Sequence, residues 1–240
     1  MLTVPKTKRA EAPPGHRRRD AAEALRRTIR GIEEAGSPEQ PRLPLGVPEI
    51  DRALPGGGLR LGCIHEVAGD ESATGFCAAL LARVWGNRRG ALLWLAQGDD
   101  LYAPGLVRYG IGAGQLLVVS GLRRQDDMLW AMEEALRCRA VRGVVAETGG
   151  TGLAAGRRLM LAAEGTGVLG LVLSRGSGAA LPHHRGHGDE LRRGGAGVRA
   201  AVSRWRVTAA PGGTDWRVAL LHCRGGRPAE WALSLGSPGC

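Results

Sequence analysis

The chain has 240 residues, 43% of them hydrophobic, which suffices for one large domain or two small ones with a buried core. No run of about 18 apolar residues occurs, which excludes a membrane-spanning helix. Five Cys without a C-x-x-C pair indicate neither a disulfide framework nor a zinc site. The basic N-terminus lacks an apolar signal core, so the expected location is the cytoplasm.

The charge balance has two interpretations. A net charge of +10 at pH 7 suggests a polyanionic partner, such as DNA, RNA or an acidic protein surface. However, Lys occurs only twice, Arg supplies the remaining basic residues, and Gly occurs 39 times. Such a composition equally fits a GC-rich genome that uses Arg wherever a surface needs charge.

Two segments precede the main domain. Residues 1–19 are basic and Pro-rich and are predicted to form a disordered tail. Residues 20–42 contain a predicted helix at 20–36 followed by a linker. The narrow apolar stripe of this helix consists of Leu25, Ile29 and Ile32. We expect the stripe to dock on the chain's own domain or on a partner.

The main domain, residues 43–240, is predicted to have an α/β fold. Short continuous apolar runs alternate with helical patterns, which is typical of a mostly parallel sheet flanked by helices. The predicted strands are 63–68, 91–96, 116–120, 143–147 and 167–174. The predicted helices are 73–86, 100–110, 126–140 and 151–164, the third capped by Asp126 or Asp127.

One pentapeptide in this pattern, QLLVV at residues 115–119, faintly resembles a sliding-clamp-binding peptide. Because it lies in a strand that we expect to be buried, clamp binding is the disfavoured interpretation.

After residue 174 the pattern changes. Residues 175–201 are rich in Gly, His and Arg and are predicted to form a flexible loop, followed by a C-terminal β segment of three antiparallel strands at 203–240. Gly beside Arg permits close approach to phosphates, so the loop is a candidate DNA contact, the alternative being a solvated linker. The candidate residues are Arg175, Arg185, Arg192, Arg193 and Arg199.

Two groups of side chains have both a functional and a structural interpretation. Three Trp of the C-terminal segment are candidates for partner contact, although capping of the sheet is favoured; they are Trp205, Trp216 and Trp231. A cluster of His could bind a metal ion, although chance content of a flexible loop is favoured; it comprises His183, His184 and His187.

A loop that resembles a phosphate loop follows the strand at 63–68. A working loop reads G-x-x-x-x-G-K-[ST], in which backbone N–H groups and the Lys hold phosphate and the hydroxyl holds Mg²⁺. From Gly69 the chain reads GDESATGF, and no Lys follows Lys8. The residues of this degenerate phosphate loop are Gly69, Asp70, Glu71, Ser72, Thr74, Gly75 and Phe76.

Two further parts of an ATPase site are altered. Glu147 ends the strand at 143–147, where an Asp for Mg²⁺ is usual, and Gln97 leads the segment where a catalytic carboxylate is expected. The chain is therefore predicted to be no enzyme and to need no cofactor or metal, while weak binding of a nucleotide stays an open alternative.

Three stretches carry a resemblance to a known family. Residues 43–72, LPLGVPEIDRALPGGGLRLGCIHEVAGDES, resemble the opening segment of a RecA core. The stretches LLWLAQGDDLYAPGLVRYGI and RWRVTAAPGGTDWRVALLHCRGGRPAEWAL are similar to ImuA, a family of bacterial RecA/SulA-like proteins. DLYAPGL and the RWRV…CRGGRP pattern are the most specific parts.

This resemblance implies a RecA-like core that acts as an accessory factor in SOS-induced translesion DNA synthesis and damage-induced mutagenesis. The implied partners are an ImuB-like Y-family polymerase homologue, a DnaE-type error-prone polymerase reached through it, and RecA. The helix at 20–36 corresponds to the RecA segment that packs on a neighbouring protomer. The implied location is the cytoplasm, with nucleoid association when active.

Three hypotheses follow. The first is a non-catalytic adaptor that holds partners through the N-terminal helix and the C-terminal β segment. The second is a DNA-binding module that places Arg residues of 1–30 and 175–206 on phosphates. The third is an unconventional ATPase.

Overall fold

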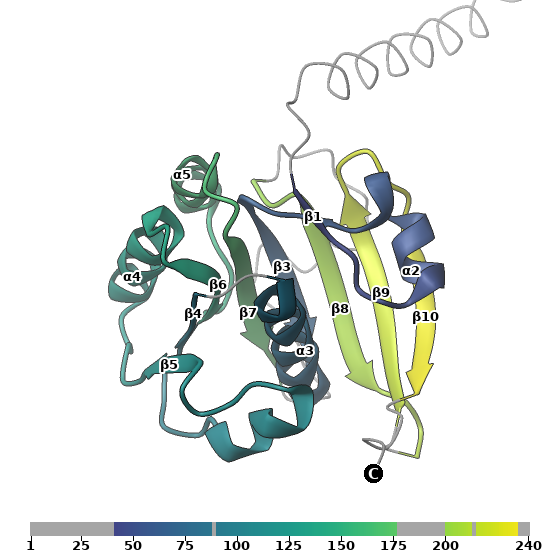
Figure 1. Ribbon diagram of the computed structural model, residues 1–240, viewed down its shortest axis with the longest axis horizontal. Helices are drawn as coiled ribbons and strands as arrows, with labels where there is room; N and C mark the ends of the chain where they lie inside the picture. The colour runs from purple at the N-terminus through teal and green to yellow at the C-terminus, as the bar shows by residue number, and fades with distance from the viewer. Residues whose placement is uncertain (1–40, 88–89, 177–199, 213–214, 235–240) are drawn as a thin grey trace, which may run out of the picture. The chain divides into compact units, whose positions relative to one another are not determined.

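The computed structural model describes residues 41–87, 90–176, 200–212 and 215–234 (Figure 1). They belong to one compact unit, Gln40–Cys240. Several predictions lie outside the described residues: the tail 1–19, the helix 20–36, and nearly all of the loop 175–201. The candidate residues among them are Leu25, Ile29, Ile32, Arg185, Arg192, Arg193, Arg199 and the three His.

The described part of the domain is built on an eight-stranded sheet in the order β10-β9-β8-β3-β7-β6-β4-β5. Neighbouring strands from β8 to β5 run parallel, whereas β9 and β10 add two antiparallel strands at one edge. The strands are β3 Cys63–Gly69, β4 Ala91–Leu95, β5 Leu116–Val119, β6 Val141–Glu147, β7 Leu169–Arg175, β8 Ser203–Ala209, β9 Asp215–Cys223 and β10 Ala229–Ser234. The prediction of an α/β fold with C-terminal antiparallel strands is confirmed.

Helices cover the two faces of the sheet. The helix α3 (Glu71–Asn87) and the short α2 (Pro48–Ala53) pack on one face, in a core that includes Trp94, Trp205 and Trp216. The helices α4 (Gln125–Arg137) and α5 (Leu153–Ala163) pack on the other face (Figure 1). A two-stranded pair, β1 (Arg42–Leu43) and β2 (Leu59–Arg60), lies beside α2, with the 3₁₀ turn η1 (Pro55–Gly57) between α2 and β2. None of the helices in the described ranges is long and apolar enough to cross a membrane.

Two details of the predicted helices are wrong. The segment predicted as a helix at 100–110 is the 3₁₀ helix η2 (Ala103–Tyr109), which has Pro at its start and ends at Gly110 with φ of +88°. The helix α4 has Arg124 at its N-cap without a side-chain cap. Asp126 and Asp127 instead lie in its first turn, where a negative charge stabilises the helix dipole.

The expectation that 116–120 is a buried strand is also wrong. β5 is the edge strand of the sheet, and Leu117 and Val118 are 57% and 37% exposed. The apolar run therefore marks an exposed edge, and the reason for disfavouring a binding function of 115–119 does not hold.

The C-terminal Trp residues are mostly internal. Trp205 is fully buried and Trp216 nearly so, and both contact Phe76 of α3. Trp231 is partly buried against Trp205. Trp205 and Trp216 therefore cannot form an exposed partner surface, because both rings fill the space between the sheet and α3. The structural interpretation is the one that their burial favours.

A buried hydrogen-bond chain ties β3 to β8. Nε2 of His65 donates to the carbonyl oxygen of Arg60 at 2.9 Å, so its Nδ1 accepts from the Ser203 hydroxyl at 2.6 Å. Ser203 in turn accepts from Nε1 of Trp205 at 2.7 Å. Burial lowers the pKa of His65 to about 4, so the ring is neutral at pH 7.

Acidification is expected to weaken the fold through His65. Between pH 6.5 and pH 4 the unfolded chain binds a proton at this residue and the folded chain does not, so stability falls as the pH falls. The expected loss between pH 6.5 and pH 5 is about 2 kcal/mol. Urea unfolding across this range should show a steeper decline for the native sequence than for His65→Asn. Equal pH slopes would contradict the assignment.

Candidate functional site

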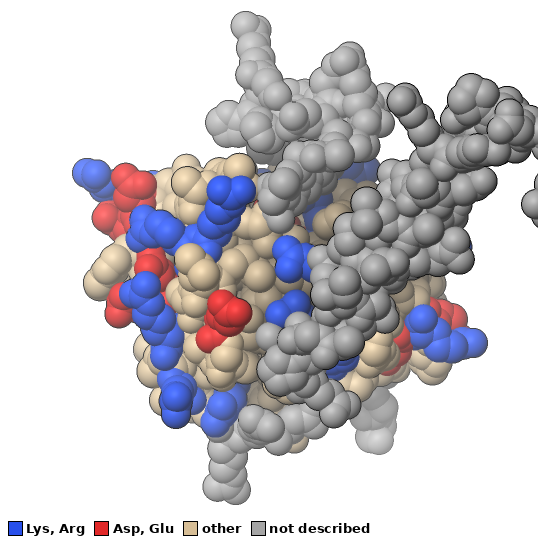
Figure 2. All heavy atoms as spheres, turned by 90° about the horizontal axis from the view of Figure 1, so that it is seen from above, with Lys and Arg blue, Asp and Glu red and all other residues tan. Residues whose placement is uncertain are grey.

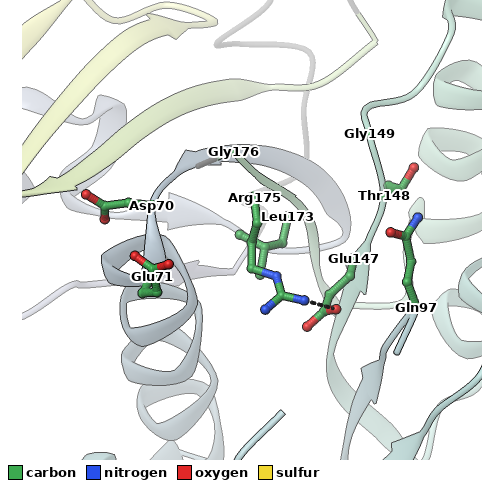
Figure 3. Close-up of a pocket in the computed structure, with 9 residues that line it drawn as sticks. All are labelled: Asp70, Glu71, Gln97, Glu147, Thr148, Gly149, Leu173, Arg175 and Gly176. Atoms are coloured by element: carbon green, nitrogen blue, oxygen red, sulfur yellow. Dashed lines mark hydrogen bonds and ion pairs between the residues drawn. The ribbon is translucent and has the colours of Figure 1, made fainter. Parts of the chain in front are cut away.

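A cavity of about 300 Å³ lies at the carboxyl ends of β3, β6 and β7, the place where open α/β sheets bind ligands (Figure 3). It is formed by the end of β3, the start of α3, and the segments that follow β4, β6 and β7. The lining residues are Asp70, Glu71, Gln97, Glu147, Thr148, Gly149, Leu173, Arg175 and Gly176.

The connection between β3 and α3 is a single residue. β3 ends at Gly69 and α3 begins at Glu71, which leaves Asp70 alone between them. The helix α3 thus begins two residues before the predicted start at 73, so Glu71 and Ser72 are helical. That residues 69–76 are a degenerate phosphate loop stays a prediction. A wrap of several backbone N–H groups around phosphate needs a longer loop than this.

Asp70 binds groups of the protein itself. Its Oδ1 accepts from the N–H of Ser72 at 2.9 Å, at the start of α3, and its Oδ2 accepts from the N–H of Ala209 at 2.9 Å, at the end of β8. Burial acts to raise the pKa of Asp70, but these hydrogen bonds outweigh it and hold the pKa below its usual value. The carboxylate thus occupies the helix N-terminus where an anion would otherwise bind.

The two glycines of the motif serve packing. A Cβ on Gly69 would lie 1.7 Å from the carbonyl oxygen of Val207, because β3 and β8 approach closely there. A Cβ on Gly75 would lie 2.5 Å from the Tyr109 hydroxyl and 2.7 Å from the Trp216 ring, which are stacked on each other. Both positions require Gly for reasons unrelated to phosphate.

Glu147 lies at the end of β6, where the sequence predicts the metal-binding carboxylate, and it is buried. Trp94 donates from Nε1 to one of its oxygens at 2.8 Å, and Arg175 donates from Nη2 to the other at 2.9 Å. Figure 3 shows the Arg175 side chain pointing across the cavity toward Glu147. Both oxygens therefore have internal partners, and a guanidinium group occupies the neighbourhood where a cation would bind.

Arg175 also reaches a second carboxylate. Its Nη1 donates to Asp100 at 2.8 Å, and this hydrogen bond lowers the pKa of Asp100. Arg175 is the last residue of β7 and so begins no loop, contrary to the predicted boundary at 175. Its predicted contact with DNA stays a prediction, but the side chain is held by two carboxylates.

The cavity is poorly suited to a nucleoside triphosphate. Three carboxylates line it, those of Asp70, Glu71 and Glu147, and Arg175 is the only cation among the lining residues. Gln97 lines the wall and carries an amide, which cannot act as a general base. Within the described part of the chain, no group of three or more His, Cys, Asp or Glu side chains could hold a metal ion.

Sequence reasoning missed Trp94 and the role of Arg175. A Trp inside a predicted core strand was the available signal, since a buried indole N–H needs an acceptor and Glu147 on the next strand supplies one. The pairing of Arg175 depends on the end of β7 lying beside the end of β6, which is a property of the sheet order.

Comparison with known proteins gives one consistent match. No protein-family model matches the chain. The chain is 39% identical to Protein ImuA of Caulobacter vibrioides, in two strains, over 220 aligned residues. The alignment covers 83% of this chain and 85% of the relative, so it extends well beyond a single shared segment.

Proposed function

The chain belongs to the ImuA family, and from this premise we propose that it is a non-catalytic adaptor in SOS-induced translesion DNA synthesis. The proposal has two parts. The RecA-like core has lost nucleotide chemistry, and it acts by holding protein partners.

The one-residue connection between β3 and α3 carries the first part. It removes the loop that would wrap phosphate, and Asp70 fills the helix N-terminus in place of an anion. The bridge between Glu147 and Arg175 supports the same conclusion, because it takes up the carboxylate that Mg²⁺ would need.

Exposed apolar side chains support the second part. Five of the seven large hydrophobic residues exposed in the described ranges come from residues 102–130; they are Tyr102, Val107, Leu117, Val118 and Trp130. This segment includes β5, whose outer edge pairs with no described strand. An exposed edge strand with apolar side chains is a template for an added strand, and it is the feature that an adaptor needs.

The proposed direct partner is the ImuB-like polymerase homologue, with the DnaE-type polymerase reached through it and RecA as a further partner. With these partners, the proposed location is the cytoplasm, and the nucleoid during DNA damage.

A single charge on the edge strand should weaken the partnership. Leu117→Glu places a carboxylate on an exposed apolar side chain of β5, so we expect at least about tenfold weaker binding of the ImuB-like protein. Copurification of the two full-length proteins measures this loss. The matched control is Leu161→Glu, at a residue of α5 that is 71% exposed, and it should bind normally. Equal binding by both variants would exclude the β5 edge as the docking surface.

A further inference from the structure

The turn between β9 and β10 has the sequence Arg-Gly-Gly-Arg-Pro, residues 224–228, and it lies at the end of the sheet opposite the cavity of Figure 3. The N–H of Gly226 donates to the carbonyl oxygen of Cys223, and Gly225 has φ of +79°, as the third residue of a type II turn requires. The turn is therefore a defined structure with an Arg on each side of its glycines.

A second cavity, of about 390 Å³, lies between this turn and the end of α2. We call it the turn cavity; it is lined by Arg52–Pro55 and Gly225–Ala229. A Cβ on Gly226 would lie within 3.4 Å of both Cys223 and Pro55, so the glycine pair is what lets the turn rest against Pro55. The missing side chains also leave the turn backbone open to a close approach from outside.

Arginines surround the turn cavity. Arg52 and Arg227 line it, and Arg42 holds its wall by donating to the carbonyl oxygen of Pro55. Arg60 lies opposite Arg42 in the β1–β2 pair.

The electrostatic surroundings of the neighbouring Cys63 thiol also indicate a concentration of positive charge here. Burial raises the pKa of Cys63 to about 12, and the positive charges of Arg60, Arg224 and Arg42 act in the opposite direction. Three guanidinium groups thus lie around one buried side chain, and Arg52 and Arg227 extend the group along the turn cavity.

Two carboxylates of α2 lie in this region, and one of them pairs with an arginine of the group. Glu49 pairs with Arg52 at 3.3 Å, and Asp51 accepts from the backbone N–H groups of Leu45 and Gly46. Neither Arg224 nor Arg227 has a carboxylate partner within the part of the chain that the structure describes. On the part of the surface that Figure 2 leaves uncovered, blue basic side chains lie next to red acidic ones at several places.

We propose that the Arg-Gly-Gly-Arg turn and the turn cavity bind the phosphate backbone of DNA. Arg224 and Arg227 contact neighbouring phosphates, the glycines let the DNA backbone approach the turn, and Arg52 supplies further charge from α2. Binding is independent of base sequence, because no aromatic or amide side chain lines the turn cavity.

DNA fits this site better than an acidic protein segment does. The guanidinium groups come from four places, β1, α2, β2 and the turn, which suits the repeated charges of a nucleic-acid strand more than one carboxylate cluster. The site is separate from the β5 edge, so its failure and the failure of partner docking are distinguishable.

The test is fluorescence anisotropy with the full chain and a fluorescein-labelled single-stranded oligonucleotide across a salt series. The variant Arg224→Ala/Arg227→Ala should bind DNA about tenfold more weakly. The slope of log K against log salt concentration should become shallower by about 1.4, near 0.7 for each phosphate contact that is lost. The control Arg139→Ala/Arg157→Ala removes the same charge from exposed residues of the α4–β6 connection and α5, and should retain affinity and slope. Both changes are at exposed residues, and unfolding curves for each variant confirm that it is folded.

Three results would overturn the proposal. The first is no DNA binding by the native sequence, and the second is an equal loss of DNA affinity in the turn variant and in the control. The third comes from a labelled polyglutamate peptide measured in parallel: if the turn variant loses binding to this peptide and keeps binding to DNA, the site serves an acidic protein.

Discussion

Gly69→Ala is expected to destabilise the fold by more than about 4 kcal/mol, at the severe end of single substitutions. The Cβ would lie 1.7 Å from the carbonyl oxygen of Val207, a backbone atom that cannot rotate away. Relief requires β3 and β8 to separate, which breaks their ladder and the bond from Ala209 to Asp70. Urea unfolding measures the loss directly.

The control for this change is Gly149→Ala on the rim of the same cavity. A Cβ there meets nothing within 4 Å, so stability should change by less than about 1 kcal/mol. If Gly69→Ala cost no more stability than this control, strand packing would not be the reason for Gly at position 69. A role of this glycine in ligand binding would then have to be considered again.

Removing Arg175 is expected to cost about 3 kcal/mol, because it leaves the buried Glu147 carboxylate without its counter-charge. The guanidinium is one-third exposed and water can enter after its removal, so we place the loss at the lower end for buried pairs. Urea unfolding of Arg175→Ala against the native sequence measures it. Arg124→Ala, which breaks the exposed pair with Asp127 at the start of α4, should cost less than about 1 kcal/mol.

A second substitution separates charge from packing. In Arg175→Ala/Glu147→Gln the neutral amide needs no counter-charge and its oxygen can still accept from Trp94, so at least half of the lost stability should return. An absence of any recovery would show that Arg175 stabilises the fold by packing, and the account of the cavity as an internal ion-pair site would fail.

Much of the sheet could be predicted because its strands are continuous apolar runs, a pattern that depends on burial on both faces. The β5 strand shows the limit of this rule. Leu117 and Val118 look the same in sequence as core residues, and only the sheet order reveals that they lie at an edge.

The position of the candidate site in the fold could be predicted from the sequence, whereas its local structure could not. Glu147 and Gly69 lie where the sequence put them, at the carboxyl ends of two strands. The length of the connection between β3 and α3 could not be predicted, because ESATGF has no signal against helix apart from one Gly. Asp70 instead caps a helix that begins at Glu71, two residues before the predicted start at 73. The role of Arg175 required the contact between β6 and β7, which no local pattern encodes.

The most direct test of the central claim, that this α/β core works without nucleotide chemistry, is ATP binding and turnover by the purified full chain. Equilibrium dialysis with labelled ATP and Mg²⁺, followed by a phosphate-release assay, measures both. The account predicts no saturable binding up to about 1 mM ATP, the upper range of ordinary enzyme affinities, and no phosphate release above the blank. Saturable binding with phosphate release that disappears in Glu147→Gln would contradict it.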